Sequence, residues 1–208
     1  MALQEPSHVI ALIRAIASGD DDEVARALER TPALAREAAN TGASRRDPAR
    51  YFLDEVGHYL YAGDTGLHFA AAAYRPDVAK RLIALGAAVG ARNRRGAQPL
   101  HYAADGNPES THWNPERQAA TIALLIRAGA DPNAVDRSGV TPLHRAVRTR
   151  SAAAVRALLD GGADPAKKNG HGSTAVDLAA RDTGRGGSGS AAARRQQSDI
   201  VRLLGNRI

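Results

Sequence analysis

The chain has 208 residues, carries a formal net charge of +6 and contains no cysteine. The lack of cysteine excludes a disulfide framework, thiolate metal ligands and a cysteine nucleophile. No apolar run approaches the roughly 20 residues that cross a bilayer, and no signal-peptide pattern begins the chain, so we expect a cytoplasmic protein.

Arginine supplies most of the positive charge, because only three of the 28 basic residues are lysines. Its planar guanidinium binds carboxylates and phosphates through two hydrogen bonds at once. The composition therefore favours an acidic or phosphate-bearing partner. A genome rich in G and C would also encode arginine and alanine often, and that alternative stays open.

The first two regions of the chain differ in pattern. Residues 7–39 have apolar residues at helical spacing, a break at Gly19 and Asp20, and a second helical segment with acidic residues at its start, where the helix dipole favours them. Residues 40–61 depart from this pattern. We expect an exposed loop up to Pro48, then a short helix and an extended segment rich in aromatic residues.

The rest of the chain divides into four predicted helix–turn–helix units. Each begins with a short motif that opens a first helix, and continues into a second helix of aliphatic residues. Two of the units contain insertions, at residues 106–116 and at the glycine-rich residues 183–192. The units cover residues 62–93, 95–135, 138–168 and 171–208.

The opening motifs of these units recur at a regular spacing. His68 and His101 are 33 residues apart, His144 lies 43 residues beyond His101, and Asp177 follows 33 residues later. The longer interval contains the insertion at residues 106–116. A unit of about 33 residues that recurs in this way indicates a repeat protein in which each unit packs on its neighbours.

The most regular unit runs from Gly129 to Asp164, around the consecutive residues Thr141, Pro142, Leu143 and His144. Its motif, period and helix pattern together resemble the ankyrin repeat. The resemblance implies an all-α ankyrin-repeat solenoid of about five helix–turn–helix units with short β-turn fingers, in one domain over residues 1–208. It also implies a protein that binds other proteins and favours a non-enzymatic role over an enzymatic one.

The motif histidines His68, His101 and His144 could suggest a metal or catalytic site. The resemblance implies that they are structural, each bonding the motif threonine or nearby backbone at a helix start and tying adjacent units together. Histidines on successive units are too far apart to share one zinc ion. Gln98 and Asp177 depart from the motif. We expect no metal and no cofactor.

In ankyrin-like stacks the finger tips and first helices form the concave face that usually binds partners. We expect that face to carry a row of cations here. Such a row favours an acidic protein segment or a phosphate-bearing ligand, and a solvated surface without a partner is the alternative. The candidate partner-binding residues are Arg94, Arg95, Tyr102, Arg137, Arg145, Arg148, Lys167 and Lys168.

All eight aromatic residues lie between Tyr51 and Trp113, and tyrosine and tryptophan are enriched in binding hot spots. A small-molecule site or an enzyme, with a histidine and a carboxylate as general base, is therefore the alternative function. The two insertions would have to fold along the stack to meet; otherwise each packs its own aromatics onto the solenoid. The candidate pocket residues are His58, Tyr59, Tyr61, Asp64, Asp105, His112 and Trp113, and Arg185 joins His112 and Trp113 in a possible second site away from the concave face.

Nucleic acid is the third candidate partner. It is less favoured, because the aromatics are not interleaved with the basic row as stacking platforms would be. The glycine-rich insertion could cradle an anion, but it lacks the Gly-Lys-Ser/Thr ending of a nucleotide-binding loop, and a flexible linker is favoured. The favoured function is a non-enzymatic protein–protein interaction module that pairs arginines with carboxylates or phosphates.

Overall fold

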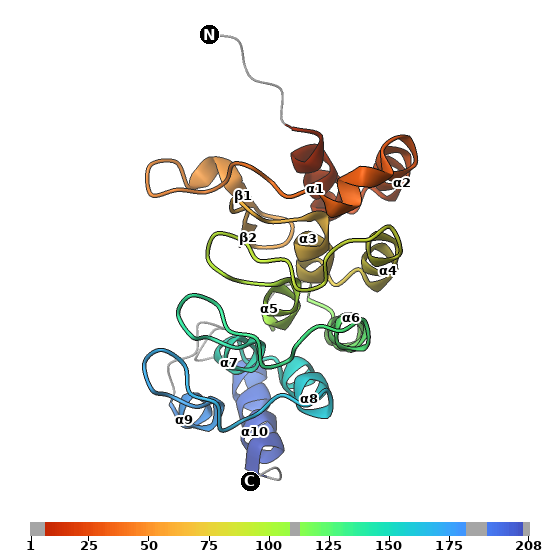
Figure 1. The fold of residues 1–208 in the computed structure, drawn as a ribbon. Coiled ribbons are helices and arrows are strands. Elements are labelled where there is room, and N and C mark those ends of the chain that lie inside the picture. Colours follow the sequence, from red (N-terminus) through yellow and green to blue (C-terminus); the bar gives the residue numbers. More distant parts are fainter. Residues whose placement is uncertain (1–6, 109–112, 182–190, 206–208) are drawn as a thin grey trace.

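A computed structural model describes residues 7–108, 113–181 and 191–205. In these ranges ten α-helices form pairs that stack into an elongated body (Figure 1). The pairs are α1 (His8–Ser18) with α2 (Asp21–Arg30), α3 (Gly66–Ala72) with α4 (Pro76–Ala84), α5 (Pro99–Ala104) with α6 (Pro115–Arg127), α7 (Pro142–Arg148) with α8 (Ala152–Asp160), and α9 (Ala175–Ala180) with α10 (Ala191–Gly205). This confirms the predicted all-α solenoid of about five helix–turn–helix units.

The helices form two layers, and the loops that join successive pairs project from one side. In Figure 1 the second helices α2, α4, α6 and α8 lie on the right, the first helices lie beside them, and the loops point to the left. Within the described ranges, no helix combines the length and the apolar character that a membrane span requires.

Small and aliphatic side chains fill the space between the layers. Ala70, Ala71, Leu100 and Ala103, all on first helices, are fully buried. Alanine has a short side chain, so adjacent layers approach closely and bury a continuous core even though no single unit could bury one alone. This packing explains how a chain with few aromatic residues still folds.

The loops also contact one another through the backbone. The amide of Arg94 donates to Ala62, that of Arg137 donates to Arg95, and that of Gly170 donates to Ser138. Gly139 has a φ of +71°, and a Cβ there would lie 2.6 Å from the backbone nitrogen of Gly170. Glycine is therefore required where these two loops meet.

Each motif histidine bonds its own helix start and the next unit. The Nε2 atoms of His68, His101 and His144 lie 3.2, 3.0 and 3.0 Å from the carbonyl oxygens of Ala97, Val140 and Ser173. The structural role implied for these histidines is confirmed.

Gln98 and Asp177, which depart from the motif, still take part in hydrogen bonds at their helix starts. The Gln98 amide donates to Nδ1 of His101, and the Asp177 carboxylate accepts from the Thr174 amide and hydroxyl.

The insertion at residues 40–61 contains a β-hairpin rather than the expected short helix. After the 3₁₀ segment η1 (Pro32–Arg36) and a loop, helical structure is limited to the 3₁₀ turn η2 (Ala49–Tyr51). Strands β1 (Phe52–Leu53) and β2 (His58–Tyr59) then pair antiparallel. Leu53 at the end of β1 and Leu60 just after β2 are buried, so the hairpin is fastened to the stack by apolar packing.

We expect Thr141→Val to lower the free energy of unfolding by about 1 kcal/mol, the usual effect of losing a helix cap. The Thr141 hydroxyl accepts from the His144 amide at 3.3 Å and lies 2.7 Å from its Nδ1. Urea denaturation measures the change. The same substitution at Thr31, which is exposed and makes no side-chain cap bond, is the control. Equal effects at both positions would contradict the capping role.

Candidate functional site

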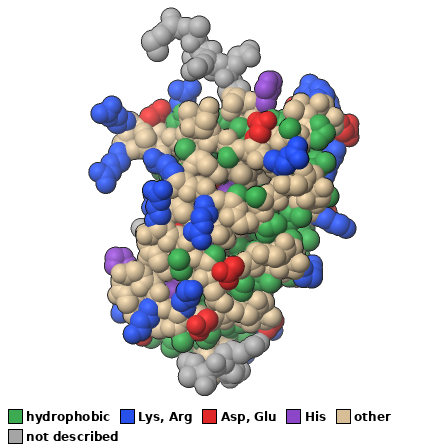
Figure 2. All heavy atoms as spheres, in the orientation of Figure 1, with side chains coloured by type: hydrophobic (Ala, Val, Ile, Leu, Met, Phe, Trp, Pro, Cys, Tyr) green, Lys and Arg blue, Asp and Glu red, His purple; other side chains and the backbone are tan. Residues whose placement is uncertain are grey.

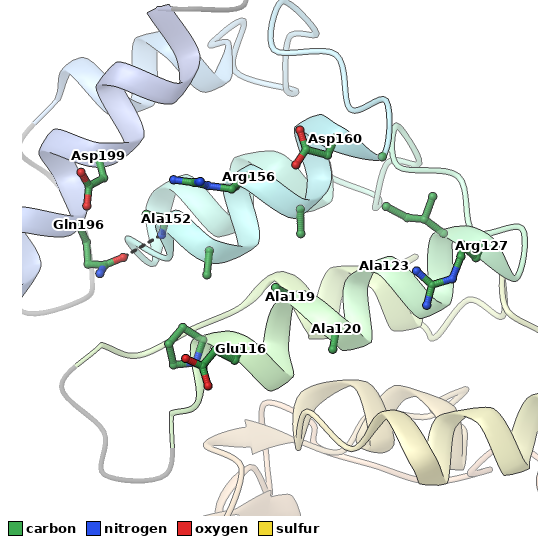
Figure 3. Close-up of a pocket in the computed structure, with 15 residues that line it drawn as sticks. Glu116, Ala119, Ala120, Ala123, Arg127, Ala152, Arg156, Asp160, Gln196 and Asp199 are labelled. Carbon is green, nitrogen blue, oxygen red and sulfur yellow. Dashed lines mark hydrogen bonds between the residues drawn. The ribbon is translucent and has the colours of Figure 1, made fainter.

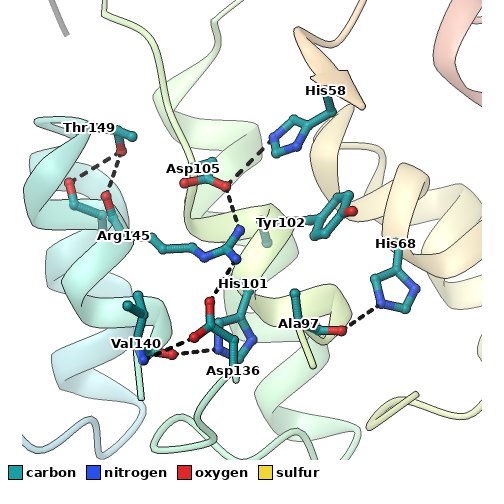
Figure 4. Close-up of polar contacts among 12 residues, drawn as sticks. His58, His68, Ala97, His101, Tyr102, Asp105, Asp136, Val140, Arg145 and Thr149 are labelled. Carbon is teal, nitrogen blue, oxygen red and sulfur yellow. Dashed lines mark hydrogen bonds and ion pairs between the residues drawn. The ribbon is translucent and has the colours of Figure 1, made fainter. Parts of the chain in front are cut away.

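His58, the first residue of β2, connects the insertion to the third helix pair. Its ring stacks on Tyr102 of α5 with a centroid separation of 4.7 Å, and its Nε2 lies 3.8 Å from Oδ2 of Asp105, the residue that ends α5 (Figure 4). The hairpin therefore folds along the stack and covers one side of α5. Burial lowers the pKa of His58, an effect that Asp105 opposes and Arg145 reinforces.

Arg145 of α7 lies between two carboxylates from different parts of the stack (Figure 4). Its Nη1 is 2.9 Å from Oδ2 of Asp105, and its Nη2 is 3.2 Å from Oδ2 of Asp136. The Arg145 side chain is only 12% exposed. Its charge is thus balanced within the protein: Arg145, which we expected to face a partner, is instead held by two half-buried carboxylates.

Tyr102 is in the core, with only 2% of its surface exposed. Its hydroxyl donates to Oδ2 of Asp64 at 2.9 Å and accepts from Nδ2 of Asn93 at 3.0 Å. Burial raises the pKa of Tyr102 well above its ordinary value, and the Asp64 charge adds to the increase. The expectation that Tyr102 contacts a partner is wrong, because the insertion covers the side of α5 that an uninterrupted stack would expose.

The remaining cationic candidates lie on or beside the loops. Arg94, Arg95, Arg137 and Lys168 are exposed, and Arg148 and Lys167 are half-buried. Figure 2 shows Lys and Arg side chains along the left edge of the molecule, where Figure 1 places the insertion and the loops between helix pairs. The exposed members of this set all lie on the loops, whereas Arg148, the last residue of α7, is half-buried.

Two of these arginines lie against Tyr61 at the end of the insertion. The Cζ atoms of Arg94 and Arg95 are 5.3 and 5.2 Å from the centre of its ring. Arg94 also donates to the carbonyl oxygen of Ala43. The argument that the aromatics are not interleaved with the basic row is therefore wrong, since the folded insertion brings Tyr61 to the loop that carries both arginines.

Tyr59 is the exposed member of an aromatic group on the hairpin. It is 38% exposed, and its ring centre lies 4.8 Å from that of Phe52 and 6.2 Å from that of Tyr61. Tyrosine and arginine are enriched among the residues that contribute most to binding near the centres of interfaces. The hairpin thus contributes apolar area beside the cationic loops.

Only part of the predicted pocket is assembled. His58 and Asp105 meet, whereas the Trp113 indole donates to Oε1 of Gln118 on α6 at 2.8 Å and its N–H is thereby occupied. His112 and Arg185 lie outside the described residues. The pairing of His58 with Asp105 follows from the hairpin lying along the stack, one of the two arrangements considered from the sequence.

A groove of about 750 Å³ opens elsewhere, between α6 and α8, with α10 at one end (Figure 3). Its floor consists largely of alanine side chains, and its rim carries charges of both signs, from Glu116, Arg127, Arg156, Asp160 and Asp199. None of the predicted pocket residues lines it. A groove of small residues by itself identifies no ligand, and we assign it none.

Sequence reasoning did not single out several polar residues that organise the site. Asn93 donates to both Asp64 and Tyr102, and Gln118 donates to the carbonyl oxygens of Ala103 and Asp105. The sequence contains only a weak signal for the roles of Asn93 and Gln118. Asn93 lies in a loop and Gln118 inside a helix, and their partners lie between 9 and 29 residues away in the sequence.

His101 shows how burial controls titration in the stack. Burial lowers its pKa to about 4, with Arg145 adding to the decrease and the Val140 carbonyl opposing it. The Gln98 amide donates to Nδ1, so protonation at that nitrogen would also break a hydrogen bond. Burial lowers the pKa of His68 and His144 as well. The motif histidines are therefore neutral near pH 7.

Comparisons with known proteins agree with this geometry. Models of the ankyrin repeat match residues 62–94 and 95–137, and a model for multiple ankyrin repeats matches residues 125–179. The chain is similar to the E3 ubiquitin-protein ligase KEG of Arabidopsis thaliana, with 44% identity over 87 residues, and to neurogenic locus notch homolog protein 1 of Danio rerio, with 32% identity over 140 residues. The matches cover 41% and 50% of this chain but 5% and 6% of those proteins.

We expect Asp105→Asn to lower the free energy of unfolding by about 2 kcal/mol, within the range for hydrogen bonds to charged groups. The change removes the negative charge between His58 and Arg145. Urea denaturation measures it. Asp54→Asn, in the exposed turn of the same hairpin, is the matched control, and a loss of similar size there would contradict the role of Asp105.

We expect acid to destabilise the protein through His101. Because its folded pKa of about 4 is below the unfolded value of 6.5, the unfolded chain binds the proton more tightly and stability falls as the pH drops below about 6.5. Between pH 7 and pH 5, His101→Gln should lose about 2 kcal/mol less stability than the wild type. Denaturation curves at pH 7, 6 and 5 measure this, and parallel losses in both proteins would contradict it.

Proposed function

The chain belongs to the ankyrin repeat family, and from this premise we propose that it is a non-enzymatic protein–protein interaction module. Its partner is a protein segment with acidic or phosphate-bearing groups, bound along the loops between helix pairs. Burial of a complementary surface and pairing of arginines with anionic groups supply the affinity.

The observation that supports this proposal most is the set of uncompensated arginines on the loops. In the described part of the chain, no carboxylate lies within ion-pair distance of Arg94, Arg95 or Arg137. Arg45 and Arg50 on the insertion are exposed as well. Like charges gathered without counter-charges raise the local potential and attract anionic partners.

Because Arg145 pairs with Asp105 and Asp136, it is less suited to contact a partner, and the proposed partner-binding surface is smaller than the sequence suggested. Because Arg145 is neutralised and Tyr102 is covered, the first helices α5 and α7 contribute less charge than an ordinary concave face would. We therefore place the partner toward the loop tips and the outer side of the hairpin, with Arg148 and Lys167 at the edge of the contact.

A small-molecule or catalytic site at His58 is the alternative. His58 and Asp105 are close, but both are engaged, since Tyr102 stacks on the imidazole and Arg145 binds the carboxylate. A general base needs a free approach to the proton that it removes. Binding of a protein accounts better for exposed arginines than chemistry at this pair does.

We expect reversal of three loop charges to release the partner. A variant with Arg95→Glu, Arg137→Glu and Lys168→Glu should bind at least about tenfold more weakly than the wild type, since each lost or reversed surface pair changes the binding free energy by up to about 1 kcal/mol. Capture from a cell extract, quantified by mass spectrometry, identifies the partner, and titration of the purified partner measures the affinity.

The control variant carries Lys80→Glu, Arg127→Glu and Arg156→Glu, which are exposed on second helices and change the net charge equally. It should retain the partner. Binding by the wild type should also weaken as salt is raised, because exposed charges are screened. Equal loss in both variants, or binding that salt does not change, would contradict the proposed surface.

A further inference from the structure

We infer that the anionic group recognised by this protein is a phosphomonoester on a peptide, bound by Arg94 and Arg95 where they lie over Tyr61. This inference rests on the proposed function and makes it specific. The surface consists of these two arginines, Tyr61, the exposed Tyr59 and the neighbouring Arg137, and we call it the aromatic–arginine surface.

Two of its cations are held in place before any ligand binds. The guanidinium groups of Arg94 and Arg95 stack within 5.3 Å of the Tyr61 ring centre, and the Arg94 amide donates to the carbonyl oxygen of Ala62 at 2.7 Å. A long arginine side chain normally loses rotamer freedom when it binds. Stacking reduces that loss, so these side chains are prepared to bind an anion.

A third cation adjoins them through the backbone contact between loops. The Arg137 amide donates to the carbonyl oxygen of Arg95 at 3.0 Å, and a Cβ on Gly96 would lie 3.1 Å from Cγ of Arg137. The stack therefore brings the backbone of Arg137 on one loop against that of Arg95 on the preceding loop. The loop of Arg94 and Arg95 also carries Arg92, whose Nη1 donates to the carbonyl oxygens of Gly96 and Val135.

The residue type favours phosphate over carboxylate. Arginine presents several N–H donors in a plane that matches phosphate oxygens, and it keeps its charge at every physiological pH. A phosphomonoester carries between 1.5 and 2 negative charges near pH 7, whereas a carboxylate carries one. Because no internal carboxylate in the described part of the chain pairs with Arg94 or Arg95, the more highly charged group gains more.

The aromatic residues favour a peptide over a nucleic acid. Stacking of successive bases requires several open ring faces. The Tyr61 ring is already in contact with two guanidinium groups, and Tyr59 packs against Phe52 and Tyr61 and is only 38% exposed. One partly open ring suits a single apolar or aromatic side chain beside the phosphate.

The test uses three degenerate peptide libraries with a fixed central residue, which is phosphotyrosine, phosphoserine or glutamate. Binding of each fluorescent library to the full chain is measured by anisotropy, together with a single-stranded oligonucleotide of similar length. We expect at least one phosphorylated library to bind about tenfold more tightly than the glutamate library. Competition by phenyl phosphate against inorganic phosphate distinguishes phosphotyrosine from phosphoserine as the source.

The variant Arg94→Lys with Arg95→Lys keeps both charges and removes the planar donors. It should lose most of the preference for phosphorylated peptide while binding the glutamate library nearly as well as the wild type. Arg127→Lys, on the exposed side of α6, should leave the preference intact. Thermal unfolding checks that each variant is folded.

The outcomes separate this inference from the proposed function. Equal binding of phosphorylated and glutamate libraries overturns the phosphate inference and leaves an acidic partner in place. Tighter binding of the oligonucleotide overturns both. If no library binds, the phosphate inference is overturned, and the charge-reversal capture described above decides the proposed function separately.

Discussion

Asp105 is contacted by four separate parts of the chain, and the arrangement of the whole surface depends on it. Its carboxylate lies beside His58 of the insertion and Arg145 of α7. Its carbonyl oxygen accepts from the Tyr74 hydroxyl and from Nε2 of Gln118. A buried or half-buried ion pair adds little net stability when complete, but it is costly to break, because one charge is then left without its partner. That ion pair joins α7 to the end of α5, and His58 of the hairpin lies beside the same carboxylate while its ring stacks on Tyr102.

That position determines which positive charges reach the solvent. With the hairpin in place, Tyr102 is buried in the core and the charge of Arg145 is balanced by carboxylates. Arg94 and Arg95, in contrast, are exposed and lie over the ring of Tyr61 from the insertion. Two groups of arginine therefore have opposite roles. Arg145, which faces carboxylates, joins two units, and Arg94 and Arg95, which do not, are exposed to solvent.

The position of the aromatic residues in the sequence predicted a binding surface only in part. Their concentration between Tyr51 and Trp113 suggested a special surface, yet Phe69 and Tyr102 are buried and Trp113 is bonded to Gln118. Much of this concentration of aromatic residues in one part of the chain therefore reflects packing against the stack. Tyr61 and Tyr51 are half-exposed and have arginines over their rings, and Tyr59 is exposed beside Tyr61.

The sequence by itself determined the repeat, the helix pairs and the structural role of the histidines. These features depend on contacts within a unit or between equivalent positions of adjacent units, so they recur at a fixed spacing. Thr141 and His144 are three residues apart, and their bond is visible in the motif. Sequence also indicated that cations would lie on the loops, since the loop positions follow from the same period.

Only the tertiary structure decided what the insertion covers and which cations stay free. His58 and Asp105 are 47 residues apart in sequence, and Asp105 and Arg145 are 40 apart. Their contacts depend on the direction in which the hairpin leaves the stack, and no periodic pattern encodes that direction. It is set by the burial of Leu53 and Leu60 and by the stacking of His58 on Tyr102, which occur only once the neighbouring units are already packed.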